Sequence, residues 1–310
     1  MFMMEELLEP LVSERFRNDG RYRAGHIGIV NALPGRRIIG VHIPDMVSLS
    51  KSLVGRDDAL EIIGQFEAAA AEEAVRGRRD ILSHEEMMVW GMMINNIGPS
   101  CLSVQGTDGL AGKGHRLLAL KLELLSRYVP YIDNWAVCDH VAGAAKWFGR
   151  AVKRPLRPSL SSGADSIAGK EDRDINICER LWMFLCGYFA SDREFEVRFA
   201  TVMAMSHFLD GRYLPRIFFQ FDSLDFGRIR SEYISPAQAK SDGCEDRAVA
   251  PGEPPYYVRM GVAWCLATAL AKFPDETRAY MRHSRLPENV VRLYVRKARE
   301  SFRTRTVSPF

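Results

Sequence analysis

The sequence predicts an all-α fold, and three observations lead to that prediction. Apolar residues recur at helical spacing along almost the whole chain of 310 residues. We find no convincing run in which apolar and polar residues alternate as they do in a half-buried strand. The expected helices also come in pairs, which repeat at about forty residues once two loop insertions are set aside.

Helical patterns follow one another in order along the chain. The stretch RRIIGVHIP is either a short extended segment or a turn into the first of them, residues 44–54. Residues 57–77, DDALEIIGQFEAAAAEEAVRG, are rich in alanine and glutamate, open on aspartate and close on glycine, so both ends of a helix are marked. The other expected helices cover residues 84–97, 113–128, 133–148, 175–190, 193–209, 255–273 and 287–303.

Two segments interrupt the helical pattern, at about 153–174 and about 234–255. Both are rich in serine, glycine, proline and charge, so we expect loops inserted in one domain. The helical pattern resumes with the same character after each segment, which argues against domain boundaries. We therefore expect residues 1–310 to form a single domain of HEAT-like repeats, stacked into a curved solenoid with a concave face. An irregular helical bundle is the alternative.

Composition indicates a cytoplasmic protein without a membrane span. Hydrophobic residues make up 47% of the chain and charged residues 26%, and the net charge is only +3. No apolar run reaches the roughly 18 residues that a span needs, and the N-terminus lacks the basic region of a signal peptide. The six cysteines form no metal-binding pattern, so we expect reduced thiols and no metal. We expect a monomer.

Three enzyme motifs are absent. GTDGLAGKGHR at 106–116 has Thr107 where a phosphate-binding loop needs its first glycine, and Gly114 where it needs a hydroxyl. HEEMM at 84–88 lacks the second histidine of a zinc protease, and the serine-nucleophile motif G-x-S-x-G does not occur. We therefore expect no cofactor.

A tryptophan and an acid share one helix face in YIDNWAVCDH. Trp135 and Asp139 are four residues apart, so they lie one above the other, and we expect Asp133 to cap the helix. On spacing alone, Trp135 is a core residue and Asp139 a surface acid. The alternative is that both side chains face one ligand.

Two further helices carry candidate residues. Arg198 stands inside an apolar helix, where its head either reaches water or holds a phosphate or carboxylate. Trp264 lies in the middle of YYVRMGVAWCLATALAKFP, a helix that is apolar nearly all round and is expected to be internal. Without other information, Trp264 is a core tryptophan.

The last expected helix carries a row of like charges. Arginines at i, i+4, i+7 and i+11 form a stripe, with Lys297 and Arg305 nearby: Arg292, Arg296, Arg299 and Arg303. Like charges at this spacing repel, and a bound polyanion relieves the repulsion. A solvated face is the plainer explanation.

These pieces resemble the DNA alkylation repair family, specifically the AlkD-like glycosylases built of HEAT-like repeats. The resemblance covers residues of about 36 to 303 and leaves out both insertions. It rests on YVPYIDNWAVCD, EVRFATVM, YYVRMGVAWCLATALAKFP and VRKARESFR, and on RRIIGVHIPDMVSLSK and HEEMMVWGMMI in the N-terminal half.

The resemblance implies a DNA glycosylase that acts on cationic N3- or N7-alkylated purines in duplex DNA. Matched residue by residue, Asp139 is the catalytic carboxylate, Trp135 and Trp264 are the two tryptophans of the cleft, and Arg198 is the nearby arginine. Backbone contacts to DNA are implied for Arg198 and Arg259, and for the basic residues Lys146, Arg150, Lys153, Arg154, Arg292, Arg296, Arg299 and Arg303.

The implied chemistry needs few groups. An alkylated purine is already a good leaving group, so one carboxylate that stabilises the oxocarbenium-like transition state is sufficient. In the family's mode the base need not enter a pocket, so a deep base pocket is not expected. Two alternatives stay open: a non-catalytic DNA-binding protein of the same fold, and a protein–protein adaptor solenoid.

Overall fold

Every regular element that the structure describes is a helix, so the predicted all-α class is confirmed. The computed structural model describes residues 4–102, 110–152, 165–233 and 255–310, without the side chains of 110–113 and 165–176. Within these ranges the extended pairing is limited to isolated β-bridges. Two of these bridges include Arg37 and Val41, so the stretch RRIIGVHIP is extended, as one of the two expectations had it.

The chain forms two compact units, Met1–Ala144 and Ala145–Phe310. Each has its own packed helices and is described by itself. A single solenoid domain over residues 1–310 stays a prediction.

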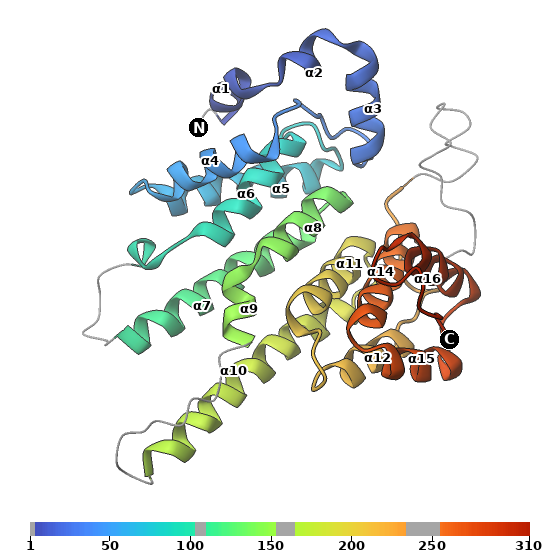
Figure 1. Cartoon of the computed structure of the whole chain (residues 1–310). Helices are drawn as coiled ribbons and strands as arrows, with labels where there is room; N and C mark the ends of the chain where they lie inside the picture. The colour runs from blue at the N-terminus through green and yellow to red at the C-terminus, as the bar shows by residue number, and fades with distance from the viewer. Residues whose placement is uncertain (1–3, 103–109, 153–164, 234–254) are drawn as a thin grey trace. The chain divides into compact units, whose positions relative to one another are not determined.

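Unit 1 contains the helices α1 to α8 (Figure 1, blue to green). They are α1 (Met4–Leu8), α2 (Glu14–Asn18), α3 (Gly20–Val30), α4 (Ile43–Val54), α5 (Ala59–Arg76), α6 (His84–Asn96), α7 (Leu110–Tyr128) and α8 (Trp135–Ala144).

Helix α6 is the centre of unit 1 and packs against α4, α5, α7 and α8. Its start is fixed by a capping box between Ser83 and Glu86. Gly91 allows α8 to approach closely, because a Cβ there would lie 2.2 Å from Val141 Cγ2 and 2.7 Å from the Tyr128 hydroxyl. The side of α8 that faces α6 is therefore buried.

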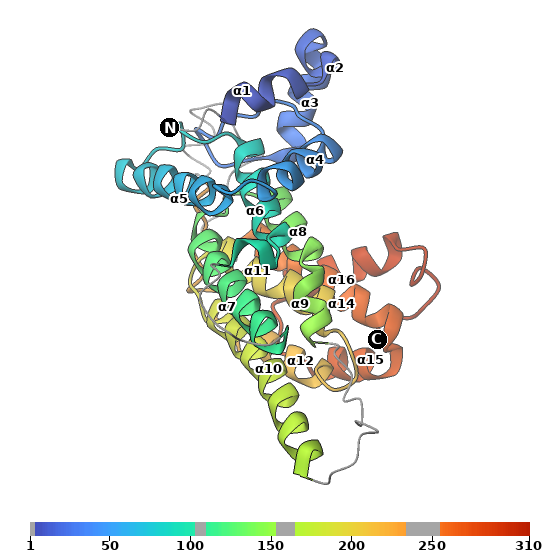
Figure 2. The same cartoon turned by 90° about the vertical axis from the view of Figure 1, so that its left-hand side faces the viewer.

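Unit 2 contains the helices from α9 onward (Figure 2, green to red). They are α9 (Lys146–Val152), α10 (Asp165–Phe189), α11 (Glu194–Met203), α12 (Leu214–Asp222), α14 (Tyr256–Lys272), α15 (Pro274–His283) and α16 (Glu288–Glu300). Helices α12 and α15 lie side by side, and Phe218 stacks on Tyr280 with ring centroids 4.1 Å apart. Helix α14 packs against α11 and α16, as expected of an internal helix.

Three predicted element boundaries were wrong. The helix expected at 133–148 is two helices, because the Ala145 carbonyl accepts hydrogen bonds from Phe148 and Gly149 and starts a new helix. Residues 165–174, expected as loop, are the start of α10, since their lysine, glutamate and arginine favour a helix. The helix expected at 193–209 changes to a π-helical turn at Ala204–Phe208.

Some predicted features lie on residues that the structure does not describe. Residues 153–164 and 234–254 hold most of the two predicted insertions, together with Lys153, Arg154 and Cys244. The other five cysteines are free thiols. Within the described ranges, none of the helices combines the length and apolar character that a membrane span requires.

Candidate functional site

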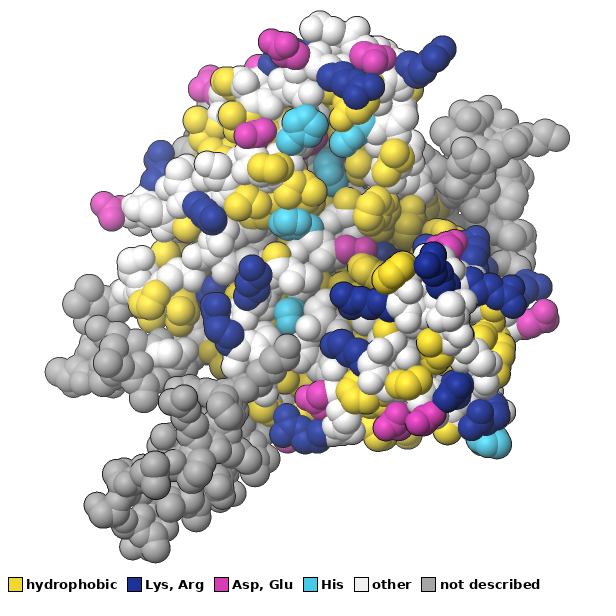
Figure 3. All heavy atoms as spheres, viewed as in Figure 1, with side chains coloured by type: hydrophobic (Ala, Val, Ile, Leu, Met, Phe, Trp, Pro, Cys, Tyr) yellow, Lys and Arg dark blue, Asp and Glu magenta, His cyan; other side chains and the backbone are white. Residues whose placement is uncertain are grey.

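A pocket of about 820 Å³ opens on unit 1 among α3, α4, α6 and α8. Trp135 and Asp139 both line it, so the spacing of four residues places them on one face, as predicted. Figure 3 shows histidine side chains gathered among hydrophobic ones over α3, α4 and α8. An aromatic ring and a carboxylate therefore line the same pocket of unit 1.

The opposite face of α8 is buried. Cys138, Val141 and Ala142 are fully enclosed against the rest of unit 1. Trp135 and Asp139 are only partly buried, because they lie on the side turned toward the pocket. Trp135 is therefore not a core tryptophan, which was the interpretation that spacing alone favoured.

Asn134 caps the N-terminus of α8. The expectation that Asp133 would be the cap was wrong. The Asn134 side-chain oxygen accepts a hydrogen bond from the Val137 backbone N–H at 3.0 Å. Asp133 is occupied elsewhere, since its carboxylate receives Nε of Arg36 at 2.6 Å and the Asn134 amide at 2.8 Å. The cap lies one residue later than expected because Asp133 is ion-paired with the buried Arg36.

A buried charge network holds this end of the helix. Arg36 donates to both Glu73 oxygens, at 2.9 and 2.7 Å, and to the Leu82 carbonyl at 2.6 Å, in addition to Asp133. All three charged side chains are almost fully buried. Since Asn134 bonds to Asp133, the network fixes the first turn of α8 and with it Trp135.

The Trp135 ring is anchored from across the pocket. Its indole N–H donates to the backbone carbonyl of Ile29, at the end of α3, at 2.9 Å. The ring is thereby held in one orientation in the pocket wall.

Four of the seven histidines of the chain line the same pocket: His26, His42, His84 and His140. The sequence does not reveal this group, because the four histidines come from separate segments that only the packing of unit 1 brings together. Desolvation lowers the pKa of His84 and His140 below 6.5, so neutral imidazole is favoured at both. His84 also lies 3.3 Å from the Asn134 amide, which can donate to its Nδ1.

Trp264 lies on the outward side of α14 in unit 2. The helix buries Val258, Val262, Cys265 and Leu266, while Trp264 is 39% exposed. The expectation of a core tryptophan was therefore wrong, because Trp264 is on the face opposite the packed residues. An exposed indole is available for contact with a ligand.

Arg198 packs against α14 one and two turns before Trp264 and is only 3% exposed. Its NH1 donates to the Tyr257 carbonyl at 2.8 Å, and a Cβ at Gly261 would be 3.7 Å from its side chain. The alternative in which its head reaches water is thus wrong. Tyr257 and Gly261 precede Trp264 on α14, so Arg198 supports the helix turns next to that tryptophan.

The other predicted DNA contacts are distributed over unit 2. Lys146 and Arg150 are exposed on α9, and Arg259 is partly buried on α14, where its guanidinium lies 6.0 Å from the centroid of the Tyr256 ring. The structure pairs Trp135 with Asp139 in unit 1, and Arg198 with the Trp264 region in unit 2.

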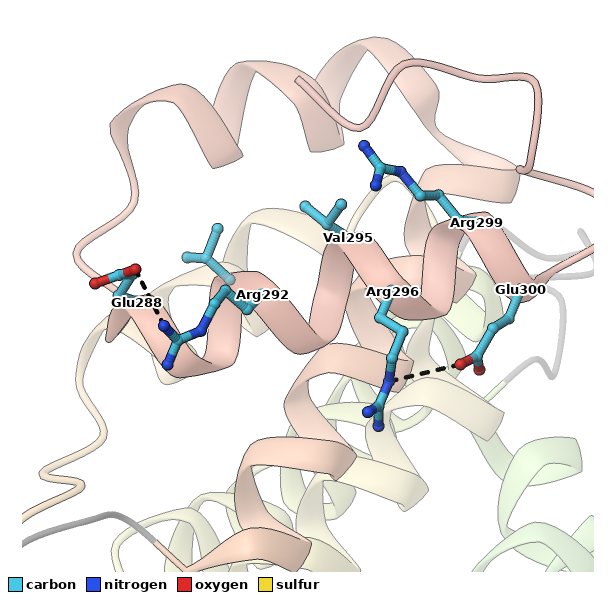
Figure 4. A pocket seen from close by; sticks show the side chains of 7 residues that line it. Glu288, Arg292, Val295, Arg296, Arg299 and Glu300 are labelled. Atoms are coloured by element: carbon cyan, nitrogen blue, oxygen red, sulfur yellow. Dashed lines mark hydrogen bonds and ion pairs between the residues drawn. The ribbon is translucent and has the colours of Figure 1, made fainter.

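Arginines on α16 line a shallow pocket of about 530 Å³. Arg292 pairs with Glu288 at 3.3 Å and Arg296 with Glu300 at 3.5 Å, whereas Arg299 points away from Arg296 (Figure 4). The two glutamates reduce the repulsion along the predicted stripe. These ion pairs are exposed and weak, so they can exchange for other anions. Arg303 lies beyond the end of the helix.

No set of three or more histidine, cysteine, aspartate or glutamate side chains in the described residues is arranged to hold a metal ion. No family model, curated protein or solved structure matches this chain.

Proposed function

We propose that the protein is a DNA repair glycosylase that hydrolyses the N-glycosidic bond of cationic N3- or N7-alkylated purines in duplex DNA. The proposal includes the finer fold, HEAT-like helix pairs stacked into a solenoid whose concave face meets the DNA. The observation that carries it is the shared exposure of Trp135 and Asp139 in one pocket of unit 1.

The pocket provides what the reaction requires. Cleavage of the glycosidic bond places positive charge on the deoxyribose, and a nearby carboxylate stabilises that charge. Asp139 is assigned this role, together with orientation of the attacking water. The electron-rich face of Trp135, one helical turn away, attracts the same developing cation.

The residues of unit 2 provide contacts to the DNA. The exposed indole of Trp264 suits packing on a sugar, and the exposed cations of α9 and α16 suit sequence-independent phosphate contacts. Arg198 is buried, so in this proposal it holds the α14 backbone that presents Trp264. Its direct contact with phosphate stays a prediction.

The first test measures the release of N7-methylguanine and N3-methyladenine from methylated duplex DNA by the wild-type protein. DNA affinity is measured in parallel on unmethylated duplex. Release of either base supports the glycosylase. DNA binding without release indicates the non-catalytic DNA-binding protein, and the absence of both favours the adaptor.

A further inference from the structure

The pocket of unit 1 is larger than contact with one sugar requires. We propose that it binds the alkylated purine itself, as a planar heteroaromatic cation that stacks on Trp135 beside Asp139. This inference rests on the proposed function, and it adds a base site to it. The resemblance by itself implied that no such pocket is needed.

The size of the pocket fits a ligand of this kind. Its volume of about 820 Å³ falls within the range of roughly 300–1,000 Å³ typical of small-molecule sites. Most of the wall is apolar and comes from four helices, with Val30 and Met88 among the buried contributors. An apolar wall with a few convergent polar groups suits the flat faces and polar edge of a purine.

The aromatic platform is prepared in advance. The hydrogen bond from the Trp135 indole to the Ile29 carbonyl holds the ring without a ligand. A fixed indole that need not be ordered on binding loses little conformational entropy. Cations bind best to tryptophan among the aromatic side chains.

The charge of the lining selects a cation. Asp45 and Asp139 contribute carboxylates, and no lysine or arginine is among the described residues that line the pocket. Burial disfavours the charged form of His84 and His140, whose pKa values are lowered, so these imidazoles do not repel a positive ligand at neutral pH. Neutral imidazoles can still accept and donate hydrogen bonds at the purine edge.

The experiment uses monomeric nucleosides and the intact chain. Binding of 7-methylguanosine, which carries the positive charge of the lesion, is compared with binding of guanosine by isothermal titration calorimetry. Chromatography after the titration verifies that the nucleoside is intact. We expect 7-methylguanosine to bind about tenfold more tightly than guanosine, from its cation–π and carboxylate interactions.

A matched pair of variants locates the site. Ile29→Arg places a cation at the rim of the pocket beside Trp135, at a position that is 69% exposed and one residue before the end of α3. Val75→Arg is the same change one residue before the end of α5, outside the pocket and 89% exposed. We expect Ile29→Arg to weaken 7-methylguanosine binding about tenfold and Val75→Arg to leave it unchanged.

Other results would overturn the base site. These are equal binding of the two nucleosides, no binding up to about 1 mM, or equal effects of the two variants. Base release from methylated DNA separates this inference from the proposed function. If the protein releases the base but does not bind the nucleoside, the base site is contradicted and the glycosylase is supported. If it binds the nucleoside but releases no base, the base site is supported and the glycosylase is contradicted.

Discussion

The side chain of Trp264 projects from a helix that is otherwise packed. Helix α14 buries residues at successive helical turns, among them Val258, Val262 and Leu266, and Trp264 is on the other side. A single exposed apolar side chain is ordinary on a protein surface. The exposure of Trp264 excludes a core role, and a role in binding DNA belongs to the proposed function.

Trp264→Ala is expected to reduce base release by about threefold to thirtyfold, since the variant has no indole face to pack on the DNA. The free energy of unfolding should change by less than about 1 kcal/mol, because the indole is partly exposed. Trp182, which is 2% exposed, provides the control, and Trp182→Ala should cost about 3–5 kcal/mol. Urea unfolding and single-turnover release measure both. Equal destabilisation by the two variants would contradict a surface role for Trp264.

The residues of the pocket differ in how far the sequence predicts them. Trp135 and Asp139 share a face by helical spacing, which is a local property that the sequence shows directly. Successive members of the four histidines are 16, 42 and 56 residues apart along the chain, and only the packing of α3, α4, α6 and α8 brings them together. Burial of Arg198 and exposure of Trp264 likewise depend on the neighbouring helices, so spacing could not determine either.

At the scale of elements, α8 is positioned by the charge network at its start. Arg36 joins Asp133 just before α8 to Glu73 on α5, and Asn134 links Asp133 to the first turn of α8. A carboxylate buried without its arginine is costly, so the network restricts the helix to one position. The network thereby holds Trp135 at the pocket.

Arg36→Met is expected to lower the free energy of unfolding by about 3–5 kcal/mol, because it leaves two buried carboxylates without their cation. Arg37→Met is the control at the adjacent position, where the ion pair with Glu5 is exposed. That pair is expected to contribute about 0–1 kcal/mol. Denaturant unfolding of both variants tests this, and equal losses of stability would show that the network does not stabilise the unit.

Acid is expected to destabilise unit 1 through its buried histidines. The folded protein holds the pKa of His84 and His140 below 6.5 by desolvation, although Glu85 and Asp133 partly oppose this at His84. Between the lowered values and 6.5 the unfolded chain binds more protons, so stability falls as the pH falls through that window. Protonation of His84 Nδ1 also removes the acceptor for Asn134.

The double variant His84→Gln/His140→Gln should therefore show a weaker loss of stability than the wild type as the pH falls below about 6.5. His283→Gln, at the exposed end of α15, is the control and should follow the wild type. Thermal unfolding as a function of pH measures the difference. The same pH dependence in all three proteins would rule out this contribution.

The helices differ in how well the sequence marks their ends. Residues 57–77 carry an aspartate at one end and Gly77 at the other, and α5 matches closely because Gly77 adopts a positive φ of 62° at the C-cap. Helices α1, α2, α3, α12 and α15 were not predicted. The first two have too few turns to show periodicity, and α3 buries only Val30, so no apolar stripe marks it. The break at Ala145 was also missed, because it depends on how α8 and α9 each pack.

At the scale of the whole molecule, charge is distributed unevenly although the net charge is only +3. Helix α16 carries exposed arginines, and its two glutamates pair with only some of them. Arg299 has no ion-pair partner among the described residues. The proposed DNA contacts of these arginines can be tested by measuring DNA affinity at equilibrium, without measuring base release.

Arg296→Gln/Arg299→Gln is expected to weaken binding to all duplex sequences alike. The slope of log affinity against log salt concentration should decrease by about 1 for each DNA phosphate that the variant no longer neutralises. The control, Arg76→Gln/Arg78→Gln, makes the same charge change at the end of α5. Fluorescence anisotropy at several salt concentrations measures the slopes. An unchanged slope in the α16 variant would place the DNA surface elsewhere.

The central claim is that Asp139 acts as the carboxylate of a DNA glycosylase. Its most direct test is single-turnover release of N7-methylguanine from methylated duplex by the wild type, Asp139→Asn and Asp57→Asn. Asp57 is an exposed acid between α4 and α5 and outside the pocket. We expect Asp139→Asn to reduce the rate by at least about a hundredfold with DNA affinity and thermal stability retained, and Asp57→Asn to match the wild type. Equal rates for Asp139→Asn and the wild type would contradict the claim.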